Sequence, residues 1–502
     1  MADHSHQVGF FVGQVLEGTT RQHGSKTALI AKEGEMSFAA LNESTTRIAA
    51  HMQNEGVKQG DRVGLLLPNS LAFAISYYAT QRMGAVTTIL DARFKGKELE
   101  GVLRDSDLSL LITHASLMPE VAKSLQGMKL PLWVVDGEGD NSFQKRLFSP
   151  PSAEFVAPRL EPDQDAVILY TSGTTGEPKG VVLTHINLAQ FPLHTTEVWV
   201  TTADSVWGCI LPMSHISGPI YCNEIIDKGS TMVIFDQINP ITILEGLAKY
   251  KVTFIHGVPP IFGLLLAVRN LKDYDTSNLR VAAMMGMTVP LSLMQAFKAA
   301  LPHIKVIQGY GLTETSPLIT ATPLRDADAK LASIGRAVPG IEVKIVDEKG
   351  QQREEGEIIT RGPHLMKGYF RRPEATAERI RNGWLHTGDV ARREADGYYY
   401  HLGRKDDMII TGGMNVYPAE VENLLSTHPK VLEAVVFPIP DPDRGKAIAA
   451  AVVPRPETEV MDRELLTFLR SNLASFKVPQ RVVIRESLPR TSTGKVKRED
   501  LG

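Results

Sequence analysis

The chain has 502 residues, enough for roughly three domains of about 150 residues each. Apolar residues make up 43% and charged residues 22%, which excludes a collagen-like, coiled-coil or globally disordered chain. There are 54 Lys and Arg against 57 Asp and Glu, a net charge of −3 that lacks the basic excess of a dedicated nucleic-acid binder. We therefore expect a globular protein with no nucleic-acid partner.

Cysteine usage and the apolar runs bear on the compartment. The two cysteines, Cys209 and Cys222, cannot form a disulfide framework, so a reducing, cytoplasmic location is expected. The first residues lack both a cationic start and an apolar stretch, which argues against a secretory signal. The apolar run 261–268 falls far short of the roughly 20 residues that span a bilayer. No transmembrane segment is expected, and peripheral membrane contact is left open.

Taken in chain order, short apolar runs alternate with longer helical stretches. The expected strands are 62–67, 108–113, 131–135, 166–170, 231–235 and 252–256, and helical spacing marks 70–84 and 241–250. This alternation predicts an α/β fold with helices on mostly parallel sheets. The polar, proline-containing segment 136–165 is expected to be a loop or linker.

The sequence pattern changes in the last third of the chain. Turns at 339–340, 349–350 and 396–397 separate short strands, which predicts a β-rich subdomain over about 331–402. The charged run 403–407 is too polar for a core. We therefore expect a large N-terminal domain over 1–402, a hinge at 403–407 and a small α+β C-terminal domain over 408–502.

A loop rich in glycine and hydroxyl groups follows the expected strand 166–170. Its backbone freedom, its hydroxyl donors and its lysine suit a polyphosphate. The residues assigned to this cradle are Thr171, Ser172, Gly173, Thr174, Thr175 and Lys179. The Walker pattern fails in every register, which disfavours a kinase or P-loop ATPase. The alternative, for this loop taken alone, is an ordinary hairpin turn.

Further segments identify the family that the chain resembles. They are 60–63, 68–69, the nucleotide segment 308–314, the ribose segment 383–389, and 403–407, 412–422 and 489–495. With these segments in this order, nearly the whole chain resembles the adenylate-forming superfamily, which contains acyl-CoA synthetases, nonribosomal adenylation domains and beetle luciferases. The resemblance implies that a carboxylate attacks the α-phosphorus of ATP and that a thiol then attacks the acyl-adenylate. It also implies ATP, Mg²⁺ and coenzyme A as participants.

The resemblance assigns roles to single residues. Lys495 would bridge the carboxylate and the α-phosphate, and Glu314 would hold Mg²⁺. Asp389 would accept hydrogen bonds from the ribose, with a further contact from Arg404. The remaining assignments are Tyr310 for adenine stacking, Gly309 and Gly311 for ATP binding, and Thr313 for catalysis and ATP binding. The alternatives are a solvated Lys495, a surface Glu314, a turn residue at Asp389 and a core aromatic at Tyr310.

The resemblance also implies a moving C-terminal domain. Asp406 falls on the family's hinge position, and Gly412 and Gly413 would offer side-chain-free backbone to coenzyme A. Rotation about the hinge would let the lysine and the thiol reach the same carbonyl in turn. A solvated loop charge is the alternative for Asp406. Met414 departs from the glutamate of many relatives, which leaves the thiol contacts open.

The acyl pocket is assigned to His215, Met285, Gly286 and Met287. His215 would shield the acyl entrance and is counted as catalytic, and the methionines would narrow an apolar cavity, favouring a medium, branched or aromatic acid. Methionines that fill core gaps behind the site are the alternative. No Asp, Arg or Lys lies between Trp207 and Tyr221, which disfavours amino acids and dicarboxylates.

The sequence thus predicts an ATP-dependent, AMP-forming acid–CoA ligase for an apolar monocarboxylate, with a fatty acid as the first expectation. An aryl-CoA ligase of the benzoate or cinnamate type is the close alternative. A non-catalytic acyl-nucleotide-binding protein is disfavoured because the catalytic charges are present. An acyl carrier protein as acceptor is left open, and the expected state is a monomer or a homodimer.

Overall fold

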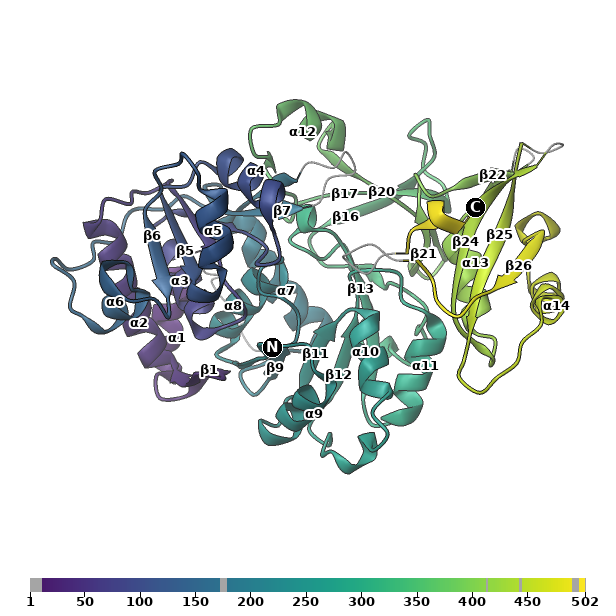
Figure 1. Ribbon diagram of the computed structural model, residues 1–502, viewed down its shortest axis with the longest axis horizontal. Coiled ribbons are helices and arrows are strands. Elements are labelled where there is room, and N and C mark those ends of the chain that lie inside the picture. Colours follow the sequence, from purple (N-terminus) through teal and green to yellow (C-terminus); the bar gives the residue numbers. More distant parts are fainter. Residues whose placement is uncertain (1–10, 172–177, 412–413, 442–444, 490–495, 502) are drawn as a thin grey trace, which may run out of the picture.

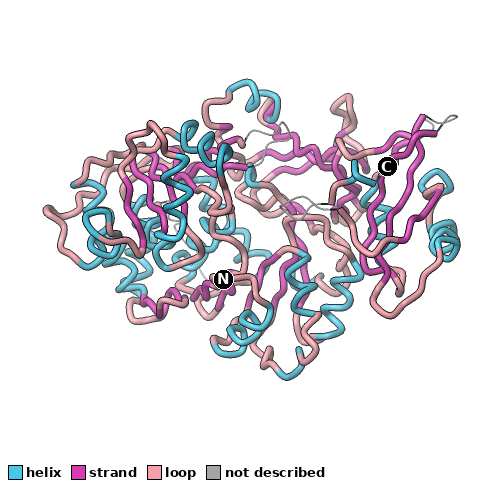
Figure 2. Tube along the Cα trace, viewed as in Figure 1, coloured by secondary structure: helices cyan, strands magenta, loops and turns pink. Residues whose placement is uncertain are grey.

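The computed structural model describes residues 11–171, 178–411, 414–441, 445–489 and 496–501. Two large sheets and a third, β-rich layer form the N-terminal part, and a separate C-terminal part lies at one end of the molecule (Figure 1). Helices cover the faces of the large sheets (Figure 2). The α/β class predicted from the sequence is therefore the observed one.

The first sheet runs in the order β18-β8-β7-β4-β3-β5-β6. Neighbours from β7 to β6 are parallel, and the β7–β8 hairpin and β18 add antiparallel strands at one edge. Its inner strands are almost wholly buried because helices cover both faces, as their continuous apolar runs predict. The bounds are β3 (Arg62–Leu66), β4 (Val86–Ile89), β5 (Leu110–His114), β6 (Leu132–Val135), β7 (Asp165–Thr171), β8 (Lys179–Thr184) and β18 (Gly368–Tyr369).

The second sheet runs in the order β15-β14-β13-β12-β11-β9-β10-β1-β2. It is parallel from β13 to β1, and antiparallel strands close both edges. The bounds are β1 (Thr27–Ala31), β2 (Gly34–Ser37), β9 (Val206–Cys209), β10 (Thr231–Ile234), β11 (Phe254–Gly257), β12 (Val281–Met284), β13 (Lys305–Tyr310), β14 (Thr320–Ala321) and β15 (Arg336–Ala337).

Three helices form a buried layer that joins the two sheets: α3 (Leu71–Arg82), α7 (His185–Trp199) and α8 (Ser217–Lys228). Helix α3 contacts β3 and β4 of the first sheet and β1 of the second, and it is buried around almost its whole circumference. Its Tyr77 hydroxyl donates to Asn223 Oδ1 at 2.9 Å, and its Tyr78 hydroxyl donates to the Cys222 carbonyl at 2.6 Å. The sheets are thus held in a fixed relation.

Other helices cover the outer faces. They are α1 (Val12–His23), α2 (Phe38–Asn54), α4 (Gly96–Ser106), α5 (Met118–Ser124), α6 (Phe143–Phe148), α9 (Pro240–Lys249), α10 (Pro259–Leu266) and α11 (Leu291–Ala300). The segment 136–165, expected to be a loop, contains α6, which begins where the Ser142 side chain accepts from the Lys145 amide at 3.2 Å. That expectation was wrong over residues 143–148, because a local cap outweighs the polar composition.

A third sheet forms the β-rich layer predicted after residue 331. Its order is β16-β17-β20-β19, and β21 pairs with β20. The strands are β16 (Glu342–Val346), β17 (Glu355–Arg361), β19 (Ile380–Arg381), β20 (Trp384–Arg393) and β21 (Tyr399–Arg404), and the short helix α12 (Pro373–Arg379) precedes β19.

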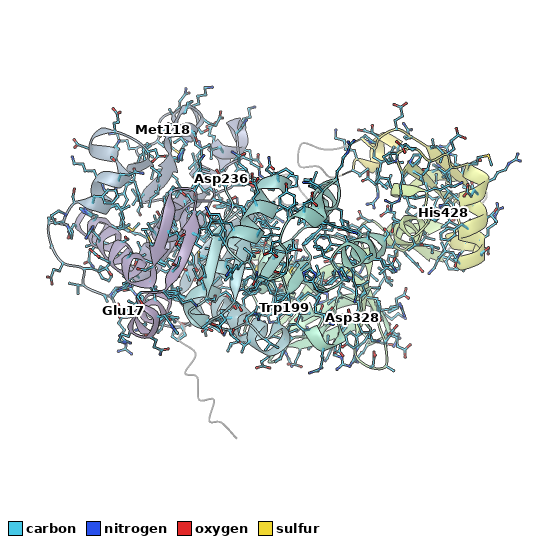
Figure 3. All side chains as sticks on the ribbon, turned by 90° about the horizontal axis from the view of Figure 1, so that it is seen from below. Glu17, Met118, Trp199, Asp236, Asp328 and His428 are labelled. Carbon is cyan, nitrogen blue, oxygen red and sulfur yellow. The ribbon has the colours of Figure 1, made fainter. Side chains whose placement is uncertain are left out.

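The C-terminal part has its own sheets and hydrophobic cores. Its elements are β22 (Ile409–Thr411), β23 (Met414–Val416), α13 (Pro418–Ser426), β24 (Val431–Asp441), β25 (Gly445–Pro454), α14 (Asp462–Asn472) and β26 (Arg481–Ile484). Figure 3 shows His428 in this part, well apart from Trp199 near the middle of the molecule. Among the described residues, no helix is both long and apolar enough to cross a membrane.

Candidate active site

The predicted phosphate loop joins the adjacent strands β7 and β8. Thr171 ends β7 and Lys179 begins β8, and the Thr171 hydroxyl donates to the Lys179 carbonyl at 3.4 Å. The Lys179 ammonium lies 5.6 Å from the centroid of the Tyr369 ring on β18. Ser172, Gly173, Thr174 and Thr175 lie outside the described residues, so their part in the cradle stays a prediction.

The nucleotide segment continues from the carboxyl end of β13, where ligands of parallel sheets commonly bind. Gly311 is required by packing, because a Cβ there would lie 1.5 Å from the Pro317 carbonyl oxygen. At Gly309 a Cβ would lie 2.8 Å from Cε of Met285. Thr313 and Glu314 follow on a short 3₁₀ turn, Thr313–Thr315.

Glu314 has a partner that the sequence did not reveal. The Tyr369 hydroxyl donates to Glu314 Oε1 at 2.8 Å. Burial and the Glu314 charge raise the pKa of Tyr369, while Arg379 opposes this rise, so the phenol stays a donor. No cluster of three or more potential metal ligands occurs within the described residues. A single carboxylate does suit Mg²⁺, which binds commonly through one or two carboxylates together with substrate phosphates.

Asp389 is buried at the junction of β20 and β21, where antiparallel register places it opposite Arg404. The Tyr310 hydroxyl donates to Asp389 Oδ2 at 2.7 Å. His401 Nε2 lies 3.6 Å and Arg404 Nε 3.8 Å from Oδ1. Burial would raise the pKa of Asp389, but His401, Tyr310 and Arg404 together hold it below its usual value. Asp389 is therefore a carboxylate, ready to accept hydrogen bonds.

Arg379, at the end of α12, lies between the Glu314–Tyr369 pair and the residues around Asp389. A Cβ added at Gly388 would lie 3.5 Å from Arg379 Nη1 and 3.4 Å from Arg404 Nη2, so both guanidinium groups lie against that glycine. The Arg379 side chain also acts on Tyr369, whose pKa it lowers. Its buried Nε has no partner among the described residues. Sequence reasoning missed Arg379, because nothing local distinguishes it from the other arginines near α12.

The predicted acyl entrance brings together residues from both large sheets. His215 lies before α8, and Asp91 and Arg93 follow β4. Arg93 Nη2 lies 2.9 Å from His215 Nε2, and Arg93 also donates to Asp91, with Nη2 2.6 Å from Oδ2. The segment between Trp207 and Tyr221 contains no Arg or Lys, so the sequence predicted no basic residue here. The fold supplies one from a segment more than a hundred residues away.

The predicted methionines of the pocket separate in the structure. Met285 is buried and packs against Gly309, whereas Met287 is exposed, and Gly286 between them has a φ of 89°. In the interior of the N-terminal part, the buried rings of an aromatic cluster contact one another: Trp207, Phe254, Tyr221, Trp199 and Phe191. These rings fill the interior with flat apolar surface.

Asp406 lies exposed between β21 and β22. The neighbouring Lys405 amide donates to the Gly388 carbonyl at 2.8 Å, and Lys405 Nζ lies 4.0 Å from Glu357 Oε2. Near the C-terminus, Arg498 donates to Glu422 Oε1 at 2.8 Å. Gly412, Gly413 and Lys495 lie outside the described residues.

Comparison with known protein families identifies the family of the chain. The model of the AMP-binding enzyme family matches residues 16–370, and that of the AMP-binding enzyme C-terminal domain matches residues 420–495. The chain belongs to the AMP-binding enzyme family.

Similar proteins place this AMP-binding enzyme more finely. It is 32% identical to a long-chain-fatty-acid–CoA ligase of Bacillus subtilis, over 97% of this chain and 93% of the relative. It is 34% identical to a feruloyl-CoA synthase of an Amycolatopsis species, over 92% of each chain. The crystal structure of ATP-bound MatB from Rhodopseudomonas palustris has a TM-score of 0.89 at 30% identity, covering 98% of each chain. These relatives confirm the predicted resemblance and its acyl-CoA synthetase branch.

Proposed function

We propose that the protein is an ATP-dependent, AMP-forming acid–CoA ligase that converts an apolar monocarboxylic acid to its acyl-CoA through an acyl-adenylate. One observation carries the proposal. Charged and hydrogen-bonding groups from separate elements converge around Gly388 beside the end of β13: Glu314, Tyr369, Arg379, Tyr310, Asp389 and Arg404. They supply an ionised acceptor suited to ribose hydroxyls and two guanidinium groups suited to phosphate.

Adenylation brings two anions together, and cations in a partly dry site lower its barrier. A pair of unit charges at 4 Å interacts by about 1 kcal/mol in water but by about 4 kcal/mol at an effective dielectric near 20. Lys179 and Arg379 of the N-terminal part would supply two such cations, and Lys495 would add a charge at the α-phosphate. Glu314 would hold Mg²⁺, which when bound neutralises phosphate charge.

The two half-reactions need different partners at one carbonyl. A hinge at 403–407, centred on Asp406, would turn residues 408–502 so that Lys495 serves the first step and Gly412 and Gly413 serve the thiol. The exposed position of Asp406 and the separate core of the C-terminal part support this division. The thiol acceptor is assigned to coenzyme A, the acceptor in the relatives' names.

A fatty acid is the first substrate candidate, because the B. subtilis relative carries that specificity in its name. An aromatic acid of the benzoate or cinnamate type is the second candidate. The similarity to a feruloyl-CoA synthase supports it. Arg93 beside His215 is already paired with Asp91. It therefore offers no unpaired positive charge to the second carboxylate of a dicarboxylic acid.

The test measures pyrophosphate release with ATP and Mg²⁺ over carboxylic acids of graded length and shape, with and without coenzyme A. Acid-dependent release with an apolar monocarboxylate, followed by acyl-CoA formation, supports the proposal. Lys495→Ala should abolish that release while ATP still binds. The matched control, Lys497→Ala in the same tail, should retain it. Release that ignores the acid, or full activity of Lys495→Ala, would contradict the assignment.

A further inference from the structure

Asp91, Arg93 and His215 form a chain of contacts between segments that follow strands of the two large sheets. Asp91 and Arg93 lie just after β4 of the first sheet, and His215 lies after β9 of the second. Both positions are at carboxyl ends of parallel strands, the edge at which such sheets bind ligands. We call these three residues the clamp.

The geometry of the clamp gives each residue a distinct part. Asp91 is nearly buried, with 11% of its side chain exposed, whereas Arg93 is 64% and His215 48% exposed. Arg93 Nε donates to Asp91 Oδ1 at 2.9 Å and Nη2 donates to Oδ2 at 2.6 Å, a two-pronged pairing that fixes the guanidinium plane. The same Nη2 lies 2.9 Å from His215 Nε2. Asp91 therefore holds the Arg93 guanidinium in a fixed orientation, and the guanidinium in turn contacts the His215 imidazole.

The contact between Arg93 and His215 determines where the imidazole proton sits. A guanidinium nitrogen has only donors, so His215 Nε2 must accept and its proton must lie on Nδ1. A doubly protonated ring has no acceptor for Arg93, and the two cations would repel each other. Asp91 Oδ2, 3.6 Å from Nε2, is the acceptor that such a ring would turn to.

We propose that Arg93, anchored by Asp91, is a positioning residue that fixes His215 as a neutral, Nδ1-protonated imidazole. The positioning itself follows from the contacts of described residues. Its consequence for the acid substrate rests on the proposed function, in which His215 faces the acyl group. Protonation of His215 separates the ring from Arg93. The kcat/KM for the acid substrate therefore falls as the pH drops below the pKa of His215.

The direction of the pH effect follows from the surrounding charges. Partial loss of water around the half-exposed ring lowers the pKa of His215, Asp91 opposes this, and Arg93 lowers it further. Among the described residues, Asp91 and Arg93 are the charged groups that act on the ring. Because His215 charges only below its lowered pKa, the clamp is closed at neutral pH. Removal of the Arg93 charge should raise the pKa and move the acidic limb to higher pH.

The decisive experiment is nitrogen NMR of the full chain labelled with ¹⁵N-histidine, titrated with pH, with His215→Gln to assign the signal. In the wild type, His215 should be protonated on Nδ1 above its pKa. In Arg93→Met, that preference should be lost and the pKa should rise. Arg104→Met is the matched control, because Arg104 is 54% exposed and pairs with Glu100 on α4, and it should leave the His215 signal unchanged.

Kinetics provides the second readout, through the pH profile of kcat/KM for the acid. Its acidic limb should move to higher pH in Arg93→Met and stay in place in Arg104→Met. A neutral His215 protonated on Nε2 in the wild type would overturn the proposal without any variant. An unchanged pKa in Arg93→Met would also overturn it. A protein that forms no acyl-adenylate would refute the proposed function, while the NMR titration would still decide the positioning.

Discussion

At Asp389, burial and hydrogen bonding act in opposite directions. Removing a carboxylate from water raises its pKa, yet the donors around Asp389 keep it ionised. The Tyr310 hydroxyl donates to Asp389, and His401 and Arg404 lie nearby. Arg404 Nε is 3.8 Å from Asp389 Oδ1, so the arginine does not form a two-pronged hydrogen-bonded pair with the carboxylate. The carboxylate thus stays charged and keeps acceptor capacity for two neighbouring hydroxyls of a ribose.

Asp389→Asn tests this role, because the amide keeps the size of the side chain and loses the charge. Hydrogen bonds to charged groups contribute about 1.5–3 kcal/mol, so ATP affinity should fall about tenfold to a hundredfold. Equilibrium titration with ATP measures the change. Tyr310→Phe, which removes one donor and leaves the carboxylate, should weaken binding less. Equal ATP affinity in Asp389→Asn and the wild type would exclude the ribose contact.

At the scale of elements, the turn between β13 and the Thr313–Thr315 helix is held by close backbone approach. Gly311 lies against the Pro317 carbonyl, and Thr315 Oγ1 accepts from the Leu312 amide at 2.9 Å. This tight turn sets where Glu314 stands relative to Tyr369. Packing alone therefore requires a glycine at position 311.

Gly311→Ala should therefore destabilise the fold, because the added methyl cannot be accommodated without moving the backbone. The expected loss is at least about 3 kcal/mol in the free energy of unfolding. Gly101→Ala is the control, since that glycine lies within α4 with no atom within 4 Å of the new Cβ. It should stabilise by up to about 1 kcal/mol. Urea unfolding measures both, and equal stability of the two variants would contradict the packing argument.

Local pattern predicted those elements whose cause is local. The apolar runs at 62–67 and 166–170 became β3 and β7, since buried parallel strands need continuous apolar sequence. Resemblance to the adenylate-forming superfamily, and not the local pattern, led to Glu314 and Asp389, whose roles stay predictions. The contacts of Tyr369, Arg379 and Arg93 escaped prediction because they join segments that only tertiary packing brings together. No periodicity along the chain encodes the 122-residue separation between Arg93 and His215.

For the molecule as a whole, stability depends on a carboxyl group inside the helical layer between the sheets. Glu224 on α8 is fully buried, and its Oε2 accepts from the Thr195 hydroxyl of α7 at 2.7 Å. Burial raises the pKa of Glu224 from 4.5 to about 7. The unfolded chain ionises near pH 4.5 while the folded chain stays protonated, so stability declines as pH rises from about 4.5 to about 7.

Glu224→Gln removes this decline, because the amide does not ionise. Relative to the wild type, the variant should gain on the order of 2–3 kcal/mol of unfolding free energy between pH 5 and pH 8. Urea unfolding at both pH values measures the gain. Glu245→Gln, on the exposed face of α9, should show no such difference. A Glu224→Gln variant with the same pH dependence as the wild type would refute a buried, protonated carboxyl.

We propose that the N-terminal sheets and the C-terminal part together form one enzyme. It would join a carboxylate to a thiol through an acyl-adenylate. The most direct test is a single turnover with an apolar acid whose carboxylate carries ¹⁸O, in the presence of ATP, Mg²⁺ and coenzyme A. Mass spectrometry should find one labelled oxygen in the phosphate of AMP, because the carboxylate attacks the α-phosphorus. Unlabelled AMP, or label in inorganic phosphate with ADP as the product, would contradict the account.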